Sequence, residues 1–243
     1  AGGDRPLRCL GPPAPTTRKR RTGRLSQARR QLLTRRSREL RWLAVDRRLT
    51  PRGEERRSQL LEVATARFAE RGYRATSISD IVGAMGVGKG VFYWYFQSKE
   101  ELFGYILTAG MTELRRTQLA AVSHSDDPLV RIPAAIRASV RWSAEHRELA
   151  SMFEFAHRDA TFGPLTSRLR ELLIDDAVAE LTSAMDAGRL PRGNADAQAR
   201  AMLAVTDALA TQGWSGGRAA EAVADDIVTF CLDGLGAATS AAA

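Results

Sequence analysis

From Pro51 to the C-terminus, the sequence follows a helical pattern that proline and glycine interrupt at intervals. In EERRSQLLEVATARFAERG, the apolar residues recur at the spacing of one helix face, acidic residues lie near the start, and Gly72 provides a stop. Few stretches show the alternation of β-branched and polar residues that is typical of strands. The sequence therefore predicts an all-α protein.

Proline and glycine also mark the breaks between the later helices. One helix is expected after Ser98, where SKEEL offers a serine cap with Glu101 three residues on, as in a capping box. The remaining helices are expected at about residues 128–148, 149–158, 164–187, 195–213 and 218–236.

Charge is distributed unevenly along the chain. Residues 1–57 contain 18 basic and 5 acidic residues, a balance of +13, whereas residues 101–243 contain 13 and 19, a balance of −6. A basic end on an acidic body is typical of a protein with an anionic partner, for which nucleic acid and an acidic membrane surface are the candidates. Nucleic acid is the usual candidate of the two, and we expect no membrane partner. No run of about 18 uncharged apolar residues suits a membrane span either.

Residues 1–50 differ from the rest in composition. The stretch GPPAPTTRKRRTGR joins prolines to a basic cluster and is typical of a poorly packed segment. Between Leu25 and Leu49, leucines recur at near-helical spacing among arginines, so three interpretations stay open: a basic amphipathic helix, a disordered tail and an upstream extension outside the working protein. If this segment binds an anionic partner, we expect it to add affinity without choosing the site, and equal salt dependence with and without residues 1–48 would contradict that.

Chemistry-bearing residues are scarce. Cys9 and Cys231 are the two cysteines of the sequence, which indicates neither a disulfide framework nor a zinc site and suits a reducing cytoplasm. None of the three histidines accompanies a nucleophile motif, and GVGKG lacks the spacing of a phosphate-binding loop. We therefore expect no enzyme activity, no metal and no cofactor.

Residues 76–96, TSISDIVGAMGVGKGVFYWYF, predict two short helices joined by a tight turn. Thr76 or Ser77 can cap the first helix, which leaves its first backbone amides facing outward. Gly86 supplies the positive φ angle that a tight turn needs, and Val87 is expected to fill the angle between the helices.

The five consecutive aromatic residues FYWYF at 92–96 restrict which side chains of the second short helix can be buried. A helix cannot bury five consecutive side chains on one stripe, and Phe92 and Phe96 suit the inner face. The residues left to point outward or along the rim are Lys89, Val91, Tyr93, Trp94 and Tyr95. A packed hairpin with purely structural aromatics is the alternative, but exposed aromatics beside lysine favour a partner, and such a helix suits a DNA major groove.

The run from Leu60 to Phe103 resembles the N-terminal domain of TetR-family transcriptional regulators. The landmarks are FAERGY, Thr76, Ile81, the Gly86–Val87 pair, KGVFYWYF and SKEEL. The resemblance implies three DNA-binding helices, a larger helical domain for ligand binding and dimerisation, and repression relieved by a small molecule. The expected parts are a poorly packed extension at 1–50, a DNA-binding domain at 54–100 with its helix-turn-helix at 77–96, and an effector and dimerisation domain at 101–243.

The resemblance also implies roles for individual residues. Thr76 matches a phosphate-contacting cap, Tyr93 a phosphate-contacting tyrosine, and Lys99 a lysine that steadies the backbone beside the following helix. Lys89, Gly90 and Val91 match the start of the recognition helix, where base edges are met. The full set of expected DNA-contacting residues is Thr76, Ser77, Lys89, Gly90, Val91, Tyr93, Trp94, Tyr95 and Lys99.

Two positions depart from the family pattern. Gly88 stands where a serine commonly caps the recognition helix, so this cap lacks a side-chain acceptor, at a cost of only a few tenths of a kcal/mol. Val91 stands where threonine is common, which favours apolar contact, for example with a thymine methyl group. These departures affect the expected operator sequence rather than DNA binding itself.

In the C-terminal part, the last two helices carry small and apolar residues, as in AMLAVTDALA and AVADDIVTFCLDGLGA. Such faces suit a four-helix dimer interface, with the monomer's own core as the alternative. A two-fold dimer would read a palindromic operator in double-stranded DNA.

An effector pocket of unknown specificity is expected at the densest cluster of aromatic and thioether side chains, and ordinary core packing is the alternative. Glu154 and Asp207 could add negative charge for a cationic ligand. The expected pocket residues are Trp142, Met152, Phe153, Phe155, His157, Phe162 and Asp207.

A non-specific nucleic-acid-binding protein that acts through its arginine-rich N-terminal segment is the rival hypothesis. Such a protein would show steep salt dependence and little sequence preference.

Overall fold

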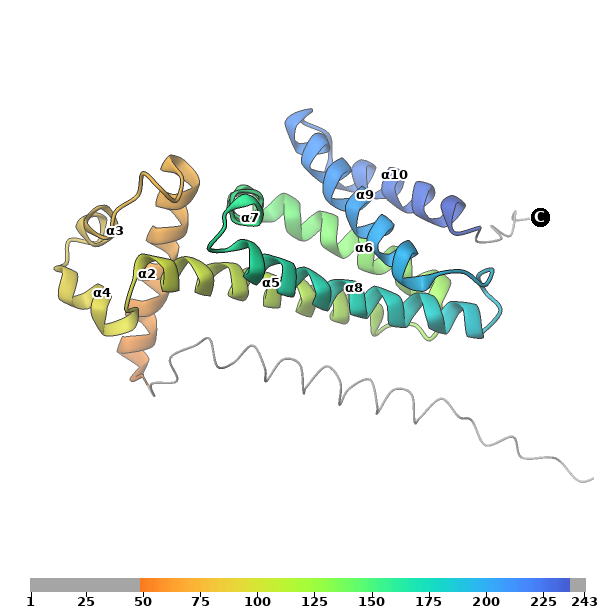
Figure 1. Ribbon diagram of the computed structural model, residues 1–243, viewed down its shortest axis with the longest axis horizontal. Coiled ribbons are helices and arrows are strands. Elements are labelled where there is room, and N and C mark those ends of the chain that lie inside the picture. The colour runs from red at the N-terminus through yellow and green to blue at the C-terminus, as the bar shows by residue number, and fades with distance from the viewer. Residues whose placement is uncertain (1–48, 237–243) are drawn as a thin grey trace, which may run out of the picture. The chain divides into compact units, whose positions relative to one another are not determined.

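The computed structural model describes residues 49–236 of the 243-residue chain, with the side chains of Trp214 and Ser215 left aside. Within this range the chain forms helices and no strand, which confirms the all-α prediction (Figure 1). No helix in the described range is long and apolar enough to cross a membrane. The expectations for residues 1–48 concern a segment outside the described range.

Three helices form the N-terminal part of the described chain: α2 (Pro51–Arg71), α3 (Ile78–Ala84) and α4 (Lys89–Tyr95). Helix α2 begins after Thr50, whose side-chain oxygen accepts a hydrogen bond from the Gly53 N–H at 3.2 Å. It ends at Gly72, where φ is +79° and the N–H donates to the Phe68 carbonyl. The buried face of α2 consists of Leu60, Ala64 and Phe68, as the apolar spacing predicts.

The remaining described helices are α5 (Lys99–Val122), α6 (Pro128–Glu145), α7 (Arg147–Arg158), α8 (Gly163–Asp186), α9 (Ala195–Ser215) and α10 (Ala220–Gly234). Their order and bounds agree with the predicted helices to within a few residues. Helix α5 runs from the three N-terminal helices alongside α8 and also packs against α6 (Figure 1). Helix α6 packs against α10, and α9 packs against both α8 and α10.

Helices α5 to α10 form the body of the described chain, and its main core lies among α6, α8, α9 and α10. Its fully buried members include Val140, Leu181 and Ile227, one from each of three helices. Gly213 lets α9 approach α10 closely, because a Cβ atom there would lie 2.6 Å from Cγ2 of Val223. The body is therefore held by contacts between segments that are far apart in the sequence.

The start of α5 differs in one detail from the predicted capping box. The Ser98 Oγ accepts a hydrogen bond from the Glu101 N–H at 3.1 Å, as expected. The Glu101 carboxylate, however, accepts from the N–H of Gln97 at 2.5 Å rather than from that of Ser98. The backbone is extended at Ser98, with φ −151°, so the preceding amide is the donor that faces the carboxylate.

Candidate DNA-binding surface and effector cavity

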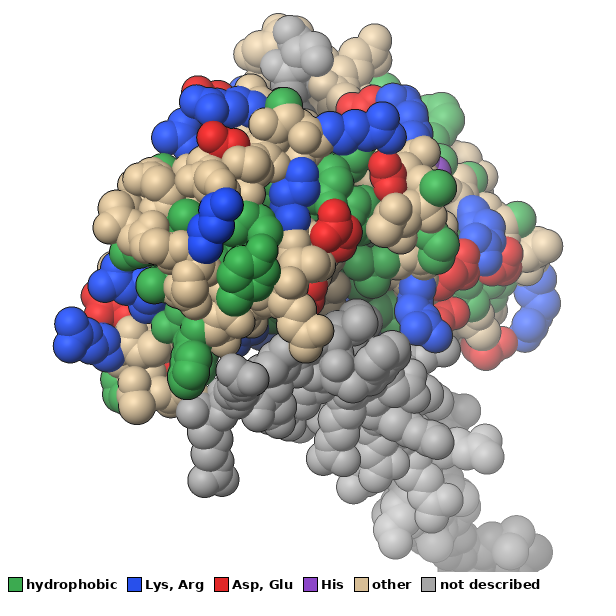
Figure 2. All heavy atoms as spheres, turned by 60° about the vertical axis from the view of Figure 1, so that its left-hand side comes forward, with side chains coloured by type: hydrophobic (Ala, Val, Ile, Leu, Met, Phe, Trp, Pro, Cys, Tyr) green, Lys and Arg blue, Asp and Glu red, His purple; other side chains and the backbone are tan. Residues whose placement is uncertain are grey.

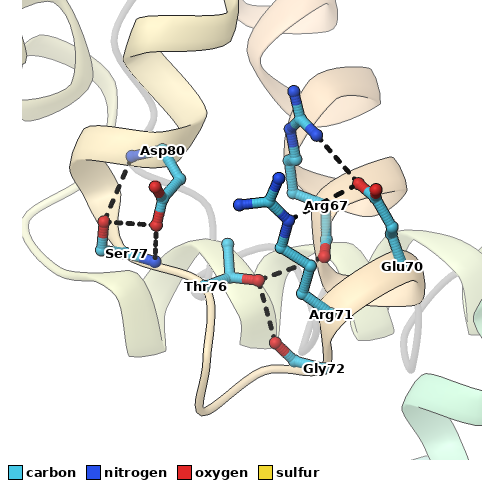
Figure 3. Close-up of polar contacts among 7 residues, drawn as sticks. All are labelled: Arg67, Glu70, Arg71, Gly72, Thr76, Ser77 and Asp80. Atoms are coloured by element: carbon cyan, nitrogen blue, oxygen red, sulfur yellow. Dashed lines mark hydrogen bonds and ion pairs between the residues drawn. The ribbon is translucent and has the colours of Figure 1, made fainter.

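Helix α3 begins with a complete capping box (Figure 3). The Ser77 Oγ accepts from the Asp80 N–H at 3.2 Å, and the Asp80 carboxylate accepts from the Ser77 N–H at 2.8 Å. The Ser77 hydroxyl also donates to the same carboxylate at 2.6 Å. These hydrogen bonds from Ser77 lower the pKa of Asp80, so the box keeps its charged acceptor.

Thr76 has a different place from the one predicted. Of the two candidate caps, Ser77 is the N-cap, while Thr76 is 1% exposed and its hydroxyl lies within 2.9 Å of the Gly72 carbonyl and 3.1 Å of the Arg67 carbonyl (Figure 3). The Thr76 side chain therefore closes the loop between α2 and α3 from inside. The prediction that this hydroxyl caps the helix is wrong, because the carbonyl groups at the end of α2 use it instead.

The turn between α3 and α4 has the predicted geometry. Gly86 has φ +66°, and a Cβ atom built on it would meet nothing within 4 Å, so its conformation rather than lack of space requires glycine. The N–H of Val87 donates to the Val82 carbonyl at 3.0 Å and closes the turn. These bonds fix the direction in which α4 leaves α3.

Helix α4 has one buried and one exposed side. Phe92 is 0% exposed and Phe96, just after the helix, is 3% exposed, whereas Tyr93 is 55% and Trp94 is 61% exposed. This division confirms the prediction from the aromatic run. Of the other expected contacts, Lys89 and Gly90 are exposed, while Val91 and Tyr95 are half-buried. Gly88 is the N-cap and makes no side-chain hydrogen bond, as expected.

Lys99 fastens the loop before α3 to the start of α5. Its Nζ donates to the carbonyl oxygens of Tyr73 at 2.9 Å and Thr76 at 2.8 Å, and it lies 4.3 Å from the centre of the Tyr73 ring. These bonds hold the protein backbone of the loop, while contact of Lys99 with DNA stays a prediction. Lys99 therefore holds the loop between α2 and α3 against the start of α5.

Figure 2 shows the face on which these helices lie, with lysine and arginine side chains interspersed with exposed apolar side chains. Two arginines lie beside the loop that Thr76 closes, where Arg67 pairs with Glu70 at 2.8 Å and Arg71 lies 3.7 Å from the same carboxylate (Figure 3). A surface that mixes positive charge with aromatic side chains can contact both phosphates and bases.

Tyr73 joins the DNA-binding helices to the body. Its ring centre lies 4.6 Å from that of Phe103, 5.6 Å from Phe155 and 5.0 Å from Phe162, which come from α5, α7 and the start of α8. Its hydroxyl donates to Glu100 at 2.7 Å. Burial, with the Glu100 bond as the second cause, raises the pKa of Tyr73 well above its ordinary value. Sequence reasoning missed this junction, although the aromatics of FAERGY and HRDATF could have suggested it.

Of the residues predicted for the effector pocket, only Asp207 lines the cavity described below. Phe155 and Phe162 belong to the junction with Tyr73, and His157 is exposed. Met152 is buried, Phe153 is half-buried and Trp142 is buried with its ring stacked on His146. Asp207, by contrast, does line a cavity.

That cavity has a volume of about 110 Å³ and lies among α5, α6, α8 and α9. Most of its lining is apolar, including Leu119, Ile136 and Met202. Its polar lining residues are Gln118, Ser139, Asp176, Glu180, Thr206 and Asp207. An apolar hollow with a few polar groups is the usual form of a small-molecule site. Sequence reasoning missed these residues, apart from Asp207, because their spacing is that of ordinary buried helix faces.

Two ion pairs brace the polar wall of the cavity. Arg115, whose side chain is 6% exposed, donates to both oxygens of Asp176 at 2.5 and 3.0 Å. Arg131 donates to Glu180 at 2.8 Å, and burial lowers the pKa of Arg131. No group of three or more potential metal-ligating side chains occurs in the described part of the chain.

A short helix on the surface packs against a capped helix, and a long helix joins the two to a helical body that contains a cavity. This arrangement is that of a helix-turn-helix regulator with a second helical part. Comparison with known proteins agrees. The family described as "Bacterial regulatory proteins, tetR family" matches residues 60–106. HTH-type transcriptional repressor Rv3405c of Mycobacterium tuberculosis is 38% identical over 173 residues, which cover 70% of this chain and 78% of that protein. The chain belongs to the tetR family.

Other relatives match in part or in fold. HTH-type transcriptional repressor KstR2 of M. tuberculosis is 34% identical over 99 residues. These residues span 50% of that relative and 41% of this chain. The solved structure of KstR2, the ketosteroid transcriptional regulator, aligns with a TM-score of 0.60 and 25% identity over 77% of this chain and 96% of that one. A regulator from Syntrophomonas wolfei aligns with a TM-score of 0.67 at 20% identity, covering 78% of this chain and 99% of that one.

Proposed function

We propose that this protein is a sequence-specific DNA-binding repressor of transcription that works in the cytoplasm and leaves its operator when a small-molecule effector binds. One observation carries the proposal: α4 presents Tyr93 and Trp94, both more than half exposed, while Phe92 anchors the helix from behind. Large aromatic side chains that are more than half exposed on a short helix are typical of a surface that meets a partner. The similarity to named repressors supports the same function.

In this proposal the start of α4 enters the major groove. Lys89 and the half-buried Val91 face base edges, and Gly90 lets the backbone approach the DNA, since a Cβ atom there would meet nothing within 4 Å. Tyr93, Trp94 and Tyr95 lie along the rim and contact phosphates or sugars. Ser77 and the first amides of α3 face the backbone on the other side. The Thr76 side chain is not included, because it is buried.

We further propose a homodimer formed through α9 and α10, so that two copies of α4 read a palindromic operator. Phe230 on α10 supports this, because its side chain is 61% exposed although it lies on a helix of the core. Small exposed residues such as Ala201 and Ala208 on α9 would permit close packing of a second copy. Residues 54–100 would then form the DNA-binding domain, with its helix-turn-helix at 77–96, and residues 101–243 the effector and dimerisation domain.

The cavity among α5, α6, α8 and α9 is the proposed effector site. Helix α5 lines it through Leu114, Gln118 and Leu119 and, at its other end, contributes Phe103 to the junction with Tyr73. A ligand that displaces α5 would therefore move the DNA-binding helices as well. This arrangement replaces the aromatic cluster on α7 as our proposed pocket.

The test is selection of binding sites from a random duplex pool by the purified full-length protein at moderate salt. We expect a palindromic consensus, and we expect Lys89→Ala to weaken binding to it while leaving the free energy of unfolding within about 0.5 kcal/mol of wild type. Tight binding without any enriched sequence would reject the proposal in favour of non-specific binding through the arginine-rich N-terminal segment.

A further inference from the structure

The polar groups that line the cavity offer more acceptors than donors. The Ser139 hydroxyl donates to the Ala135 carbonyl at 2.8 Å, and the Thr206 hydroxyl donates to the Met202 carbonyl at 2.8 Å, so both protons are already used within their own helices. The amide nitrogen of Gln118 donates to the Ser139 oxygen at 2.7 Å. The hydroxyl groups therefore turn lone pairs, not hydrogens, toward a ligand.

Three carboxylates complete the polar lining: Asp176, Glu180 and Asp207. Each accepts from an arginine, namely Arg115, Arg131 and Arg170 respectively. None of these arginines belongs to the lining, and the described residues that line the cavity include no lysine, arginine or histidine. The acids thus face the hollow while their cationic partners lie outside its lining.

The carboxylates also retain the capacity to accept further hydrogen bonds. An ionised carboxylate has about four lone-pair sites, of which Arg115 uses two on Asp176 and Arg170 uses one on Asp207. Asp207 is the most exposed of the three carboxylates, with a side chain that is 60% exposed. It is the carboxylate that an entering polar group can reach without breaking a buried ion pair.

We propose that the effector is an apolar molecule with an ammonium or amidinium group, whose hydrocarbon part fills the cavity and whose cationic group binds Asp207 with support from Asp176 and Glu180. This inference rests on the proposed function of the cavity as the effector site. A carboxylate or phosphate would find one further donor there, the second N–H of the Gln118 amide, among hydroxyl lone pairs and carboxylates, which is unfavourable in a partly buried site. The volume of about 110 Å³ is below the roughly 150 Å³ of an engineered cavity that takes benzene, which limits the hydrocarbon part to at most one ring.

The chemistry of the relatives' ligands does not carry over to this cavity. The alignment with KstR2 covers 41% of this chain, and the lining residues lie outside the 60–106 segment that the family description matches. The class of effector therefore has to be judged from this chain's own lining.

Three matched probes separate the possibilities: benzylammonium, benzyl alcohol and benzoate share a ring and differ in the polar group. Their affinities for the full-length protein can be measured by calorimetry or by ligand-observed NMR at millimolar concentration. We expect benzylammonium to bind at least about tenfold more tightly than benzoate, with benzyl alcohol between them. Benzoate binding as tightly as benzylammonium, or no binding by any probe, would overturn the proposal.

Two charge-matched variants localise the effect. Asp207→Asn should reduce benzylammonium affinity at least about fivefold without reducing benzoate affinity. Asp186→Asn is the control, because Asp186 is 62% exposed and pairs with Arg192 at 3.3 Å, away from the cavity. Equal losses in both variants would mean that overall charge, not the cavity, attracts the cation.

DNA binding by the same preparations distinguishes failure of the effector proposal from failure of the repressor proposal. If the wild-type protein selects a palindromic site but shows no preference among the probes, the inference about the effector fails and the repressor proposal stands. If no DNA sequence is selected, the repressor proposal fails, whatever the probes do.

Discussion

The DNA-binding helices and the cavity-bearing body are built by different kinds of contact. In α3 and α4, the deciding interactions join residues a few positions apart, such as the Ser77–Asp80 capping box and the turn closed by Val87 on Val82. In the body they join distant segments, such as Arg115 with Asp176 and Arg131 with Glu180. The comparison teaches that local signals shape the surface that meets DNA, whereas the cavity exists only through tertiary packing.

This difference does not make the DNA-binding helices independent of packing. Helices α3 and α4 have 7 residues each, shorter than the roughly 12–15 residues that an isolated helix needs in water. They therefore depend on a few fully buried side chains, among which Ile81 and Phe92 are 0% exposed. Caps and turns choose the conformation, and these side chains stabilise it.

The largest expected effect tests that dependence. Phe92→Ala should lower the free energy of unfolding of the DNA-binding helices by about 3–5 kcal/mol, because it leaves a cavity where a whole ring was buried. Operator binding should be lost with it. Chemical denaturation followed by circular dichroism measures the change, and Lys89→Ala on the exposed side of α4 serves as the control. A loss below about 1 kcal/mol would show that Phe92 does not anchor α4.

The second prediction concerns the body. Arg115→Met should lower the free energy of unfolding by roughly 2–4 kcal/mol, because the Asp176 carboxylate stays largely buried without its cation. The double variant Arg115→Met with Asp176→Leu should recover most of that stability, since no charge is then left unpaired. If the double variant is no more stable than the single one, the ion pair is not the source of the effect.

The two regions also differ in how far the sequence predicts them. The Gly86 turn and the division of the α4 aromatics into a buried and an exposed side follow from rules that act over a few residues, and the structure confirms both. The same rules left Thr76 and Ser77 open as the cap of α3, and the structure selects Ser77. Thr76 escaped those rules, because its hydroxyl is captured by the Arg67 and Gly72 carbonyls, which only the folded loop brings close.

The proposed effector site could not be predicted in the same way. Aromatic content drew attention to α7, but Phe155 and Phe162 pack against Tyr73, a residue more than 80 positions earlier in the chain. The cavity is lined by residues such as Leu119, Ala135 and Leu203, whose spacing is that of any buried helix face. The packing of the four helices decides which of these buried faces borders a cavity, and this packing cannot be read from a single sequence.

A third prediction separates backbone conformation from space in the local region. Gly86→Ala should lower the free energy of unfolding by about 1–2 kcal/mol, because φ is +66° there although a Cβ atom would meet nothing. Gly83→Ala is the matched control: it lies inside α3 with equally open surroundings and should raise stability by up to about 1 kcal/mol. Thermal or chemical unfolding of the two variants checks this, and effects of the same sign would refute the role assigned to the turn.

The smallest expected effect lies at the junction between the two regions. Tyr73→Phe removes the hydrogen bond to Glu100 but keeps the ring against Phe103. It should lower the free energy of unfolding by at most about 1 kcal/mol, because solvent screens the exposed carboxylate and weakens this bond. The hydrogen bond from Tyr73 is the main cause that lowers the pKa of Glu100 below its ordinary 4.5. A group with a lowered folded-state pKa stabilises the fold above its ordinary pKa, and this contribution disappears as the pH falls through the lowered value. The difference in stability between wild type and Tyr73→Phe should therefore be largest above pH 4.5 and shrink in more acidic solution. Unfolding curves recorded across that range measure it, and a difference that grows toward low pH would contradict the assignment of Glu100 as the acceptor.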